Sequence, residues 1–436
     1  MHNGHLSISA QIYTNFFIPQ TPPRSFESRP EIVAELFRDS FFLRWRMSIF
    51  AIMNSPFIYD KYVTGKDFIG RKEDCAQLAA LIGEGSHVAL YDVPRSGKTS
   101  LIQQTLFNMK LAGKRFMAGQ FSLLNVRSVA EFLLRYGATA VRAAASTPDE
   151  YESLVGRHLD GTRFFFDRNA YAESGRVISL RGEPEAGDID AMLRLPWAIA
   201  AEKGQPLLMI MDEFQNIDLT EDGDGICAAL EKAVDEKASA AEPGCVFIFC
   251  GSMVNAMKSI FEVRRRFYRK ATRFALGRID EKDIIEHVVK GFLVGGKIIE
   301  RELLLGTCRL FRNHIGYINH FIAICDSMSK GYIVEATLMD ALDAILAIHR
   351  PRFMAAMNNL TTFQVSMLKA VLDGVSKLSS SEAIDAYSLN SSANVKRLKD
   401  ALAKKELVVF GPGDEAVLED PLFEYWVRKY YFEMKG

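Results

Sequence analysis

The stretch that decides the fold is HVALYDVPRSGKTSLIQQTL, residues 87–106. It opens with five mostly apolar, strand-like residues and closes with apolar residues at helical spacing. Between them, SGKTS supplies the glycine, lysine and hydroxyl residues of a Walker A motif. A strand, a glycine loop and a helix in this order direct backbone N–H groups and a helix N-terminus at one anion. The sequence therefore predicts a nucleotide phosphate site.

The residues of this loop have expected roles. Lys98 is expected to reach the β- and γ-phosphates, and the Thr99 hydroxyl to take one Mg²⁺ position. One position departs from the pattern G-x-x-x-x-G-K-[ST], because Asp92 stands where glycine is expected. We expect its carboxylate to point away from the phosphates, which leaves binding intact. The nucleotide-binding residues predicted from the loop are Pro94, Arg95, Ser96, Gly97, Lys98, Thr99 and Ser100.

A second motif is PLLMIMDEFQ, residues 206–215. A continuous apolar run of this kind is typical of a parallel strand that is covered on both faces. Asp212 is expected to support Mg²⁺, and Glu213 to polarise the water that attacks the γ-phosphate. Solvated acids often end buried strands, but two half-motifs in the right order favour ATP and Mg²⁺ as ligands.

A third apolar strand, CVFIFCGS, spans residues 245–252. The carboxyl ends of parallel strands are where open α/β folds place their ligands. Ser252 is therefore a candidate sensor of the phosphate or the water. The alternative that stays open is an ordinary N-cap for the following helix.

Composition sets wider bounds. The chain has 436 residues, 48% of them hydrophobic and 25% charged, which fits two to four globular domains. A net charge of −1 gives no overall attraction to nucleic acid. The six cysteines contain no C-x-x-C pair, which indicates buried thiols in a reducing compartment. No apolar run approaches the roughly eighteen residues of a membrane span, so we expect a cytoplasmic protein without membrane contact.

The C-terminal module predicts a winged helix-turn-helix. Apolar residues at helical spacing begin at Phe363, a short helix covers 381–387, and a third helix starts near Ser392. Two strand-like runs, 407–410 and 415–418, then flank the turn GPGD. Three helices followed by a β-hairpin are typical of this motif.

The outer face of the third helix carries five basic residues against two acidic ones, a local charge of +3. Lys396 and Arg397 are the candidate DNA-binding residues, since that surface of a winged helix meets the major groove. A charge of +3 supports fewer phosphate contacts than a committed DNA binder makes. A solvated helix on a protein-interaction module is an equally open reading.

We expect four segments along the chain. Residues 1–52 form a poorly ordered extension, or alternatively carry a docking helix over 31–52; a natural start at Met53 would place them outside the protein. The ATPase domain covers 53–278, with a mostly helical stretch at 126–204. A helical lid covers 279–356, and the winged helix 357–436.

Together these parts resemble the archaeal-type ATPases of the STAND group, relatives of AAA+ proteins, over residues 54–432. The carriers are FIGR (68–71), SGKTS (96–100), DEFQ (212–215), GS (251–252) and DPLFEYW (420–426). The resemblance implies an α/β fold: a parallel P-loop sheet with helices on both faces, an all-α lid and a winged helix. It also implies Gly70 and Arg71 as nucleotide contacts. A Tyr-Gly-Arg element of the family is matched by Tyr268-Arg269-Lys270, which implies Arg269 or Lys270 at the phosphates.

These features predict an ATP-binding ATPase. Binding and slow Mg²⁺-dependent hydrolysis of ATP would switch the conformation of the lid and the winged helix. Two alternatives stay open: a DNA-binding regulator, and a protein scaffold, each with a mainly structural nucleotide. A homo-oligomer is compatible with all three.

Overall fold

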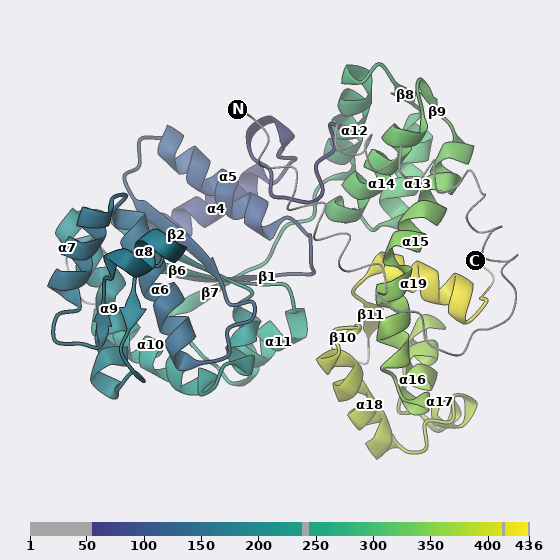
Figure 1. Cartoon of the computed structure of the whole chain (residues 1–436). Coiled ribbons are helices and arrows are strands. Elements are labelled where there is room, and N and C mark those ends of the chain that lie inside the picture. Colours follow the sequence, from purple (N-terminus) through teal and green to yellow (C-terminus); the bar gives the residue numbers. More distant parts are fainter. Residues whose placement is uncertain (1–54, 238–243, 412–414, 435–436) are drawn as a thin grey trace, which may run out of the picture. The chain divides into compact units, whose positions relative to one another are not determined.

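A parallel sheet of five strands organises the N-terminal half of the chain (Figure 1). The computed structural model describes residues 55–237, 244–411 and 415–434. The strand order is β2-β5-β6-β1-β7, and every pairing is parallel. The strands are β1 (His87–Tyr91), β2 (Met117–Ser122), β5 (Leu207–Asp212), β6 (Cys245–Gly251) and β7 (Ala271–Phe274). The loop that follows β1 and the acids that end β5 therefore both lie at the carboxyl ends of the strands.

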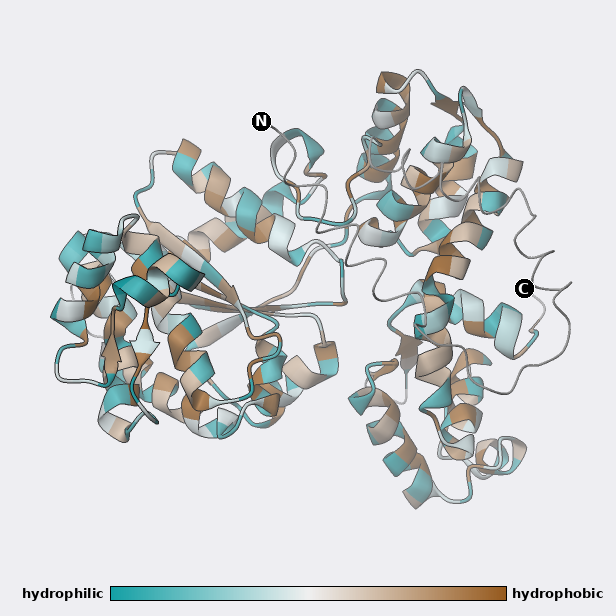
Figure 2. Cartoon of the chain, in the orientation of Figure 1, coloured by the Kyte–Doolittle hydropathy of each residue, from teal (hydrophilic) through white to brown (hydrophobic). Residues whose placement is uncertain are grey.

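Both faces of this sheet are covered, which explains why its strands are apolar throughout. Val88 and Leu90 of β1 pack with α4 (Lys72–Gly83) and α5 (Lys98–Leu111). Ala89 and Tyr91 join the core of the opposite face. That face is covered by α6 (Val129–Ala144), α7 (Pro148–His158), α9 (Ala186–Lys203) and α10 (Gly223–Lys237). The strands are accordingly mostly brown in the hydropathy colouring of Figure 2, whereas the helices alternate between brown, apolar residues and teal, polar ones.

The stretch between β2 and β5 is mostly helical, as expected. It also contains α8 (Arg168–Ser174) and an antiparallel pair of short strands, β3 (Phe164–Phe165) and β4 (Ser179–Leu180). After β5 and β6 come three short helical segments, η2 (Phe214–Leu219), α11 (Val254–Lys258) and the π-helix η3 (Ser259–Val263).

The next part of the chain is helical. It consists of α12 (Glu281–Val294), α13 (Arg301–Leu310), α14 (Ile315–Met328) and α15 (Glu335–Asn358). Two-residue strands, β8 (Ile298–Ile299) and β9 (Tyr332–Ile333), pair in parallel between them. Helix α15 continues across the boundary expected at residues 356–357. None of the helices in the described ranges is long and apolar enough to cross a membrane.

The C-terminal module has the predicted order of elements. Helices α16 (Thr362–Leu372), α17 (Ser381–Ala386) and α18 (Ser392–Lys404) precede the antiparallel strands β10 (Val408–Phe410) and β11 (Ala416–Leu418). The Ser391 hydroxyl accepts the N–H of Asn394 and caps α18. Val395, Leu398 and Leu402 form its buried stripe. A further helix, α19 (Pro421–Trp426), and the π-helix η5 (Val427–Tyr431) follow the hairpin.

The predicted fold class is confirmed: a parallel α/β sheet, a helical part and a winged helix. All six cysteines are buried free thiols, as predicted. Strand β7 was not predicted. The leader at 1–52 lies outside the described residues, and the limits of the four segments stay predictions.

Candidate nucleotide-binding site

The loop between β1 and α5 wraps around the start of the helix. Gly97 adopts φ +96°, a left-handed conformation that glycine reaches without strain, and α5 begins at the next residue. The N–H of Leu101 donates to the Gly97 carbonyl at 2.9 Å, so the helical ladder starts at the glycine. This arrangement leaves the earlier N–H groups of the first turn available to an anion.

Lys98 is buried under the loop, with 7% of its surface exposed. Its Nζ donates to the carbonyl oxygens of Asp92 and Val93, both at 2.8 Å, and lies 3.5 Å from the Ser96 hydroxyl. Burial lowers the pKa of Lys98, and the neighbouring acids oppose that effect. An ammonium group held among neutral carbonyls would gain a charged partner from a phosphate oxygen.

Asp92 occupies its position without the backbone freedom of glycine. It is not among the described residues that have positive φ. Its carboxylate turns back on the main chain, where Oδ1 accepts the N–H of Val93 at 2.8 Å. The departure from the motif therefore introduces no backbone strain into the loop.

Two acids and a serine meet at the ends of β5 and β6. Glu213 has φ +52°, and its Oε2 accepts the Ser252 hydroxyl at 2.7 Å. The same oxygen accepts Nε2 of Gln215. Ser252 does not cap α11, because the N-cap residue is Met253 and no side chain caps that position. One carboxylate oxygen of Glu213 is thus fixed by two donors, which leaves Oε1 for a water molecule.

Asp212 and Thr99 carry the oxygen atoms that could hold Mg²⁺. Asp212 is half-buried, and its pKa is raised by burial first and by the Glu213 charge second. A bound cation would relieve both effects. The Thr99 hydroxyl and the Asp212 carboxylate supply the oxygen ligands that Mg²⁺ prefers. Within the described ranges no cluster of three or more His, Cys, Asp or Glu residues could hold a metal ion.

Helix α14 touches the loop at its N-terminus. His314 Nε2 lies 2.9 Å from the Pro94 carbonyl, and its Nδ1 accepts the N–H of Tyr317 at 3.2 Å. Burial lowers the pKa of His314, which keeps the imidazole neutral as these two bonds require. Gly316 permits this approach, because a Cβ there would lie 2.6 Å from the Cβ of Arg95.

Two of the predicted nucleotide contacts, Ser100 and Arg71, have partners within the protein, and a third, Gly70, is closely packed. Ser100 Oγ accepts the N–H of Val63 at 3.1 Å. Arg71 donates from Nη1 to the Ser96 carbonyl at 2.7 Å and from Nε to Gly277 at 3.0 Å, so it braces the loop from outside. Gly70 has φ +58°, and a Cβ there would meet the Asp283 carboxylate at 2.9 Å.

Arg269 and Lys270 lie at the amino ends of the strands, opposite to the phosphate loop. They precede β7, and Ala271 of β7 pairs with His87 at the start of β1, whereas the loop follows the end of β1. Lys270 pairs with Asp235 at 2.7 Å, and Arg269 stacks on Tyr268. The strand direction therefore separates both cations from the phosphate loop of their own chain, contrary to what the resemblance implied.

Arg273 was missed by the sequence analysis. Its guanidinium carbon lies 3.3 Å from the ring centroid of Tyr91, and Nη1 donates to the Tyr91 carbonyl at 3.0 Å. Burial lowers its pKa. Only the pairing of β7 with β1 reveals this position, as β7 is a short strand with two exposed residues.

The winged helix contacts the part of the chain that contains the parallel sheet, at α11. Both carboxylate oxygens of Glu406 accept main-chain donors there, from Asn255 at 3.0 Å and Ala256 at 2.8 Å. In return, Asn255 Nδ2 donates to the Ala403 carbonyl at 3.1 Å. Glu406 is one of the two acidic residues counted on the outer face of the predicted third helix, but it lies beyond the end of α18 and caps α11. Burial raises its pKa.

Glu419 lies in the same buried junction. Its pKa is raised to about 8, by burial first and then by the Glu406 carboxylate, with smaller effects of Lys258, Asp92 and Asp420. Its Oε1 is buried and has no hydrogen-bond partner among the described residues. This side chain is thus a buried acid that favours its neutral form.

Glu419→Gln is expected to stabilise the protein more at pH 8 than at pH 5. Because the pKa of Glu419 is raised from 4.5 to about 8, its contribution to stability is fully present below about pH 4.5 and is lost as the pH rises through about 8. Glutamine stays neutral throughout, so at pH 8 it should raise the free energy of unfolding by about 1–3 kcal/mol.

Thermal unfolding midpoints at pH 5 and pH 8 measure this difference. Glu302→Gln, an exposed carboxylate on α13, is the matched control and should show no such dependence. A gain of equal size at both pH values would contradict the assignment.

Comparisons with known proteins agree with this architecture. A family model described as a probable winged helix domain matches residues 351–429. No curated protein matches the sequence. Among solved structures, the chain is similar to a Walker-type ATPase of Pyrococcus abyssi, with TM-score 0.60 and 14% identity over 85% of this chain and 99% of that one. It is also similar to the Orc2 protein of Aeropyrum pernix, solved with ADPNP and ADP, with TM-score 0.52 and 12% identity over 85% and 94%.

At these identities the likeness shows the fold alone, and it does not single out the STAND group. The chain therefore has the fold of a Walker-type P-loop ATPase with a winged helix at its C-terminal end.

Proposed function

We propose that the protein binds ATP with Mg²⁺ and hydrolyses it slowly. The observation that carries the proposal is the meeting of Lys98, Asp212 and Glu213 at one edge of the sheet, with the Glu213 carboxylate held by Ser252 at 2.7 Å. A lysine on a phosphate loop and two consecutive acids at the end of the neighbouring buried strand are what phosphoryl transfer requires.

The roles divide by chemistry. Lys98 and the N–H groups of the loop bind the phosphates, and Thr99 and Asp212 hold Mg²⁺, which when bound neutralises charge on the phosphate oxygens. Glu213 orients and polarises water through its free oxygen. Arg273, an exposed residue whose guanidinium packs on the Tyr91 ring at the end of β1, is the intrachain cation that the sequence did not indicate.

Two contacts support a coupling of nucleotide to conformation. His314 links α14 to the Pro94 carbonyl in the phosphate loop, and Glu406 links the winged helix to the helix that follows Ser252. A nucleotide that changes the loop or Glu213 would act directly on both contacts. This is the arrangement expected of a switch in which ATP repositions the helical part and the winged helix.

Calorimetric titration with ATP and a phosphate-release assay test the proposal on wild type, Lys98→Ala and Glu213→Gln. Binding that depends on Lys98 and Mg²⁺-dependent release that depends on Glu213 are the expected results. A wild-type protein that neither binds ATP nor releases phosphate would rule the proposal out.

DNA binding through the winged helix is a second candidate function. Lys396 and Arg397 are exposed in the first half of α18, away from the contact that Ala403 and Glu406 make with α11. A helix in this position of a winged helix fits the major groove. With so few cations, one protomer would bind weakly, so a useful affinity needs self-association.

Reversing both charges, Lys396→Glu with Arg397→Glu, is expected to abolish binding to duplex DNA and to leave ATP binding unchanged. Fluorescence anisotropy over a salt series measures the affinity, which should fall steeply with salt. Lys369→Glu with Lys377→Glu makes the same charge change at exposed positions elsewhere in the module and should have a smaller effect. A wild-type chain that binds no DNA at low salt would assign the module to protein contacts.

A further inference from the structure

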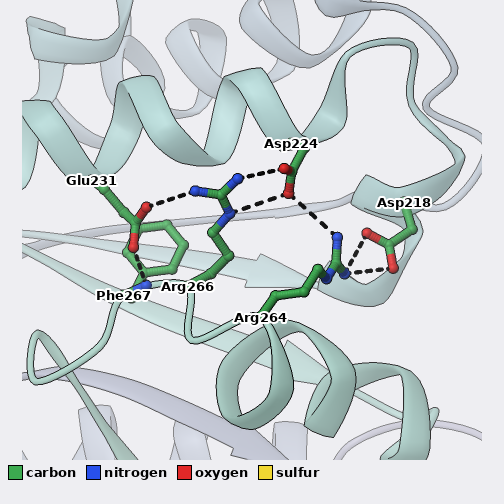
Figure 3. Close-up of polar contacts among 6 residues, drawn as sticks. All are labelled: Asp218, Asp224, Glu231, Arg264, Arg266 and Phe267. Carbon is green, nitrogen blue, oxygen red and sulfur yellow. Dashed lines mark hydrogen bonds and ion pairs between the residues drawn. The ribbon is translucent and has the colours of Figure 1, made fainter.

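A charged network joins the segment after η3 to η2 and α10 (Figure 3). Arg264 Nη2 lies 2.7 Å from both carboxylate oxygens of Asp218. Arg266 donates from Nε to Asp224 at 3.1 Å and from Nη1 to Glu231 at 3.2 Å. Glu231 also accepts the N–H of Phe267, and Asp224 lies between the two arginines.

The network lies at the far ends of the two segments that carry the site. Helix η2 begins directly after Glu213 and contains Asp218. Ser252 leads into α11 and η3, and Arg264 follows η3 directly. The near ends of the same segments are joined by the Ser252–Glu213 hydrogen bond of 2.7 Å. The segment from Glu213 through η2 and the segment from Ser252 through η3 are therefore joined to each other at both of their ends.

The backbone is strained at both ends of this pair of segments. Glu213 has φ +52°, Arg265 +54° and Phe267 +55°, all left-handed conformations that residues with a Cβ rarely adopt. Such conformations persist only where the surroundings fix them. Here the buried rings of Phe214 and Phe267 pack in one aromatic cluster, and the ion pairs hold the chain on either side.

The ion pair itself is too exposed to add much stability. The side chains of Arg264 and Asp218 keep 33% and 38% of their surface in solvent. Pairs of this kind contribute little to folding. The Arg264 guanidinium nevertheless spans two carboxylates, since Nη2 contacts both oxygens of Asp218 and Nη1 lies 3.4 Å from Asp224. This planar arrangement limits how η2 can rotate.

We propose that Arg264 is a positioning residue, which clamps η2 through Asp218 and so holds the Glu213 carboxylate in place for turnover; Arg266 ties the same segment to α10 through Asp224 and Glu231. This inference rests on the proposed role of Glu213 in hydrolysis. Neither arginine touches the phosphate loop, so the clamp acts only through η2. Small displacements of a catalytic group lower rates strongly while leaving substrate binding intact.

Arg264→Gln is therefore expected to lower kcat about tenfold and to leave the Kd for ATP and the melting temperature unchanged. Asp218→Asn should have the same effect, because it removes the same pair from the other side. The double variant should be no worse than either single variant, as expected for one shared interaction. Arg264→Lys keeps the charge but has one nitrogen in place of the two that contact Asp218 and Asp224, so its kcat should lie between those of wild type and Arg264→Gln.

Phosphate release at saturating ATP, calorimetric ATP binding and thermal unfolding are measured on wild type and these variants. Arg168→Gln is the matched control: Arg168 also pairs with two acids, Asp149 and Glu152, and its side chain is 58% exposed. Its kcat should equal that of wild type. A split between kcat and Kd in the clamp variants alone supports the inference.

Three outcomes would overturn it. The first is a wild-type kcat in Arg264→Gln and Asp218→Asn; the second is a Kd that rises as much as kcat falls. The third is a loss of kcat in Arg168→Gln that equals the loss in the clamp variants. A wild-type chain that binds ATP but releases no phosphate would instead reject the proposed hydrolysis, and with it the role of the clamp.

Discussion

Lys98→Ala is expected to abolish the stabilisation that ATP with Mg²⁺ gives the wild-type protein. At an ATP concentration a hundredfold above Kd, that stabilisation should be about 2.7 kcal/mol. The physical reason is the position of Nζ, which is buried within 2.8 Å of two loop carbonyls and adjoins the start of α5. Alanine removes the only side-chain cation that the loop directs inward, and the phosphates would then face neutral carbonyl oxygens.

The measurement is the thermal unfolding midpoint with and without ATP and Mg²⁺, and the increment is compared within each protein. This comparison allows for any change that alanine causes in the unliganded protein. Lys72→Ala, an exposed lysine at the start of α4, is the control and should keep the full increment. Equal increments in wild type and Lys98→Ala would show that the loop does not bind the nucleotide.

Glu213→Gln is expected to retain ATP binding and to lose turnover by about 10²–10⁴-fold, the range that a positioned general base supplies. Glutamine has nearly the shape of glutamate, and its carbonyl oxygen can still accept the Ser252 hydroxyl. It cannot take up a proton from the attacking water. Asp212→Asn, in contrast, should weaken the Mg²⁺-dependent part of binding, because it removes the carboxylate expected to hold the ion.

Single-turnover phosphate release and calorimetric titration separate the two effects. Glu221→Gln provides a matched change at an exposed glutamate just beyond η2, and its rate should equal that of wild type. If Glu213→Gln turned over as fast as wild type, Glu213 would not be the base. The proposed positioning role of Arg264 would then be rejected as well.

The sheet and its loop could be predicted because their signals are local. Helix α5 follows the glycine loop as predicted, since the glycine before it and the apolar spacing within it both lie in adjacent sequence. The same holds for β5 and β6, whose unbroken apolar runs reflect burial on both faces. In the winged helix, caps such as Ser391 and the apolar stripe of α18 are equally local.

The rest depends on pairings between distant residues. Strand β7 is an edge strand in which two of four residues are exposed, so it lacks the apolar run that identified its neighbours. Without its direction, Arg269 and Lys270 could not be placed at the amino ends of the strands. His314 and Glu406 act on segments more than 140 residues earlier in the chain, and no periodicity reports such contacts.

The cap that Glu406 provides for α11 makes the two modules dependent on each other. Helix α11 has only five residues, and two of its first N–H groups find their acceptor 150 and 151 residues later in the chain. The contacts within Ser55–Gly436 accordingly form a single unit. Modules of this kind are often pictured as parts that evolution can exchange freely. Here a foreign winged helix would have to bring a carboxylate to the same place, because otherwise the N–H groups of Asn255 and Ala256 would lose their acceptor.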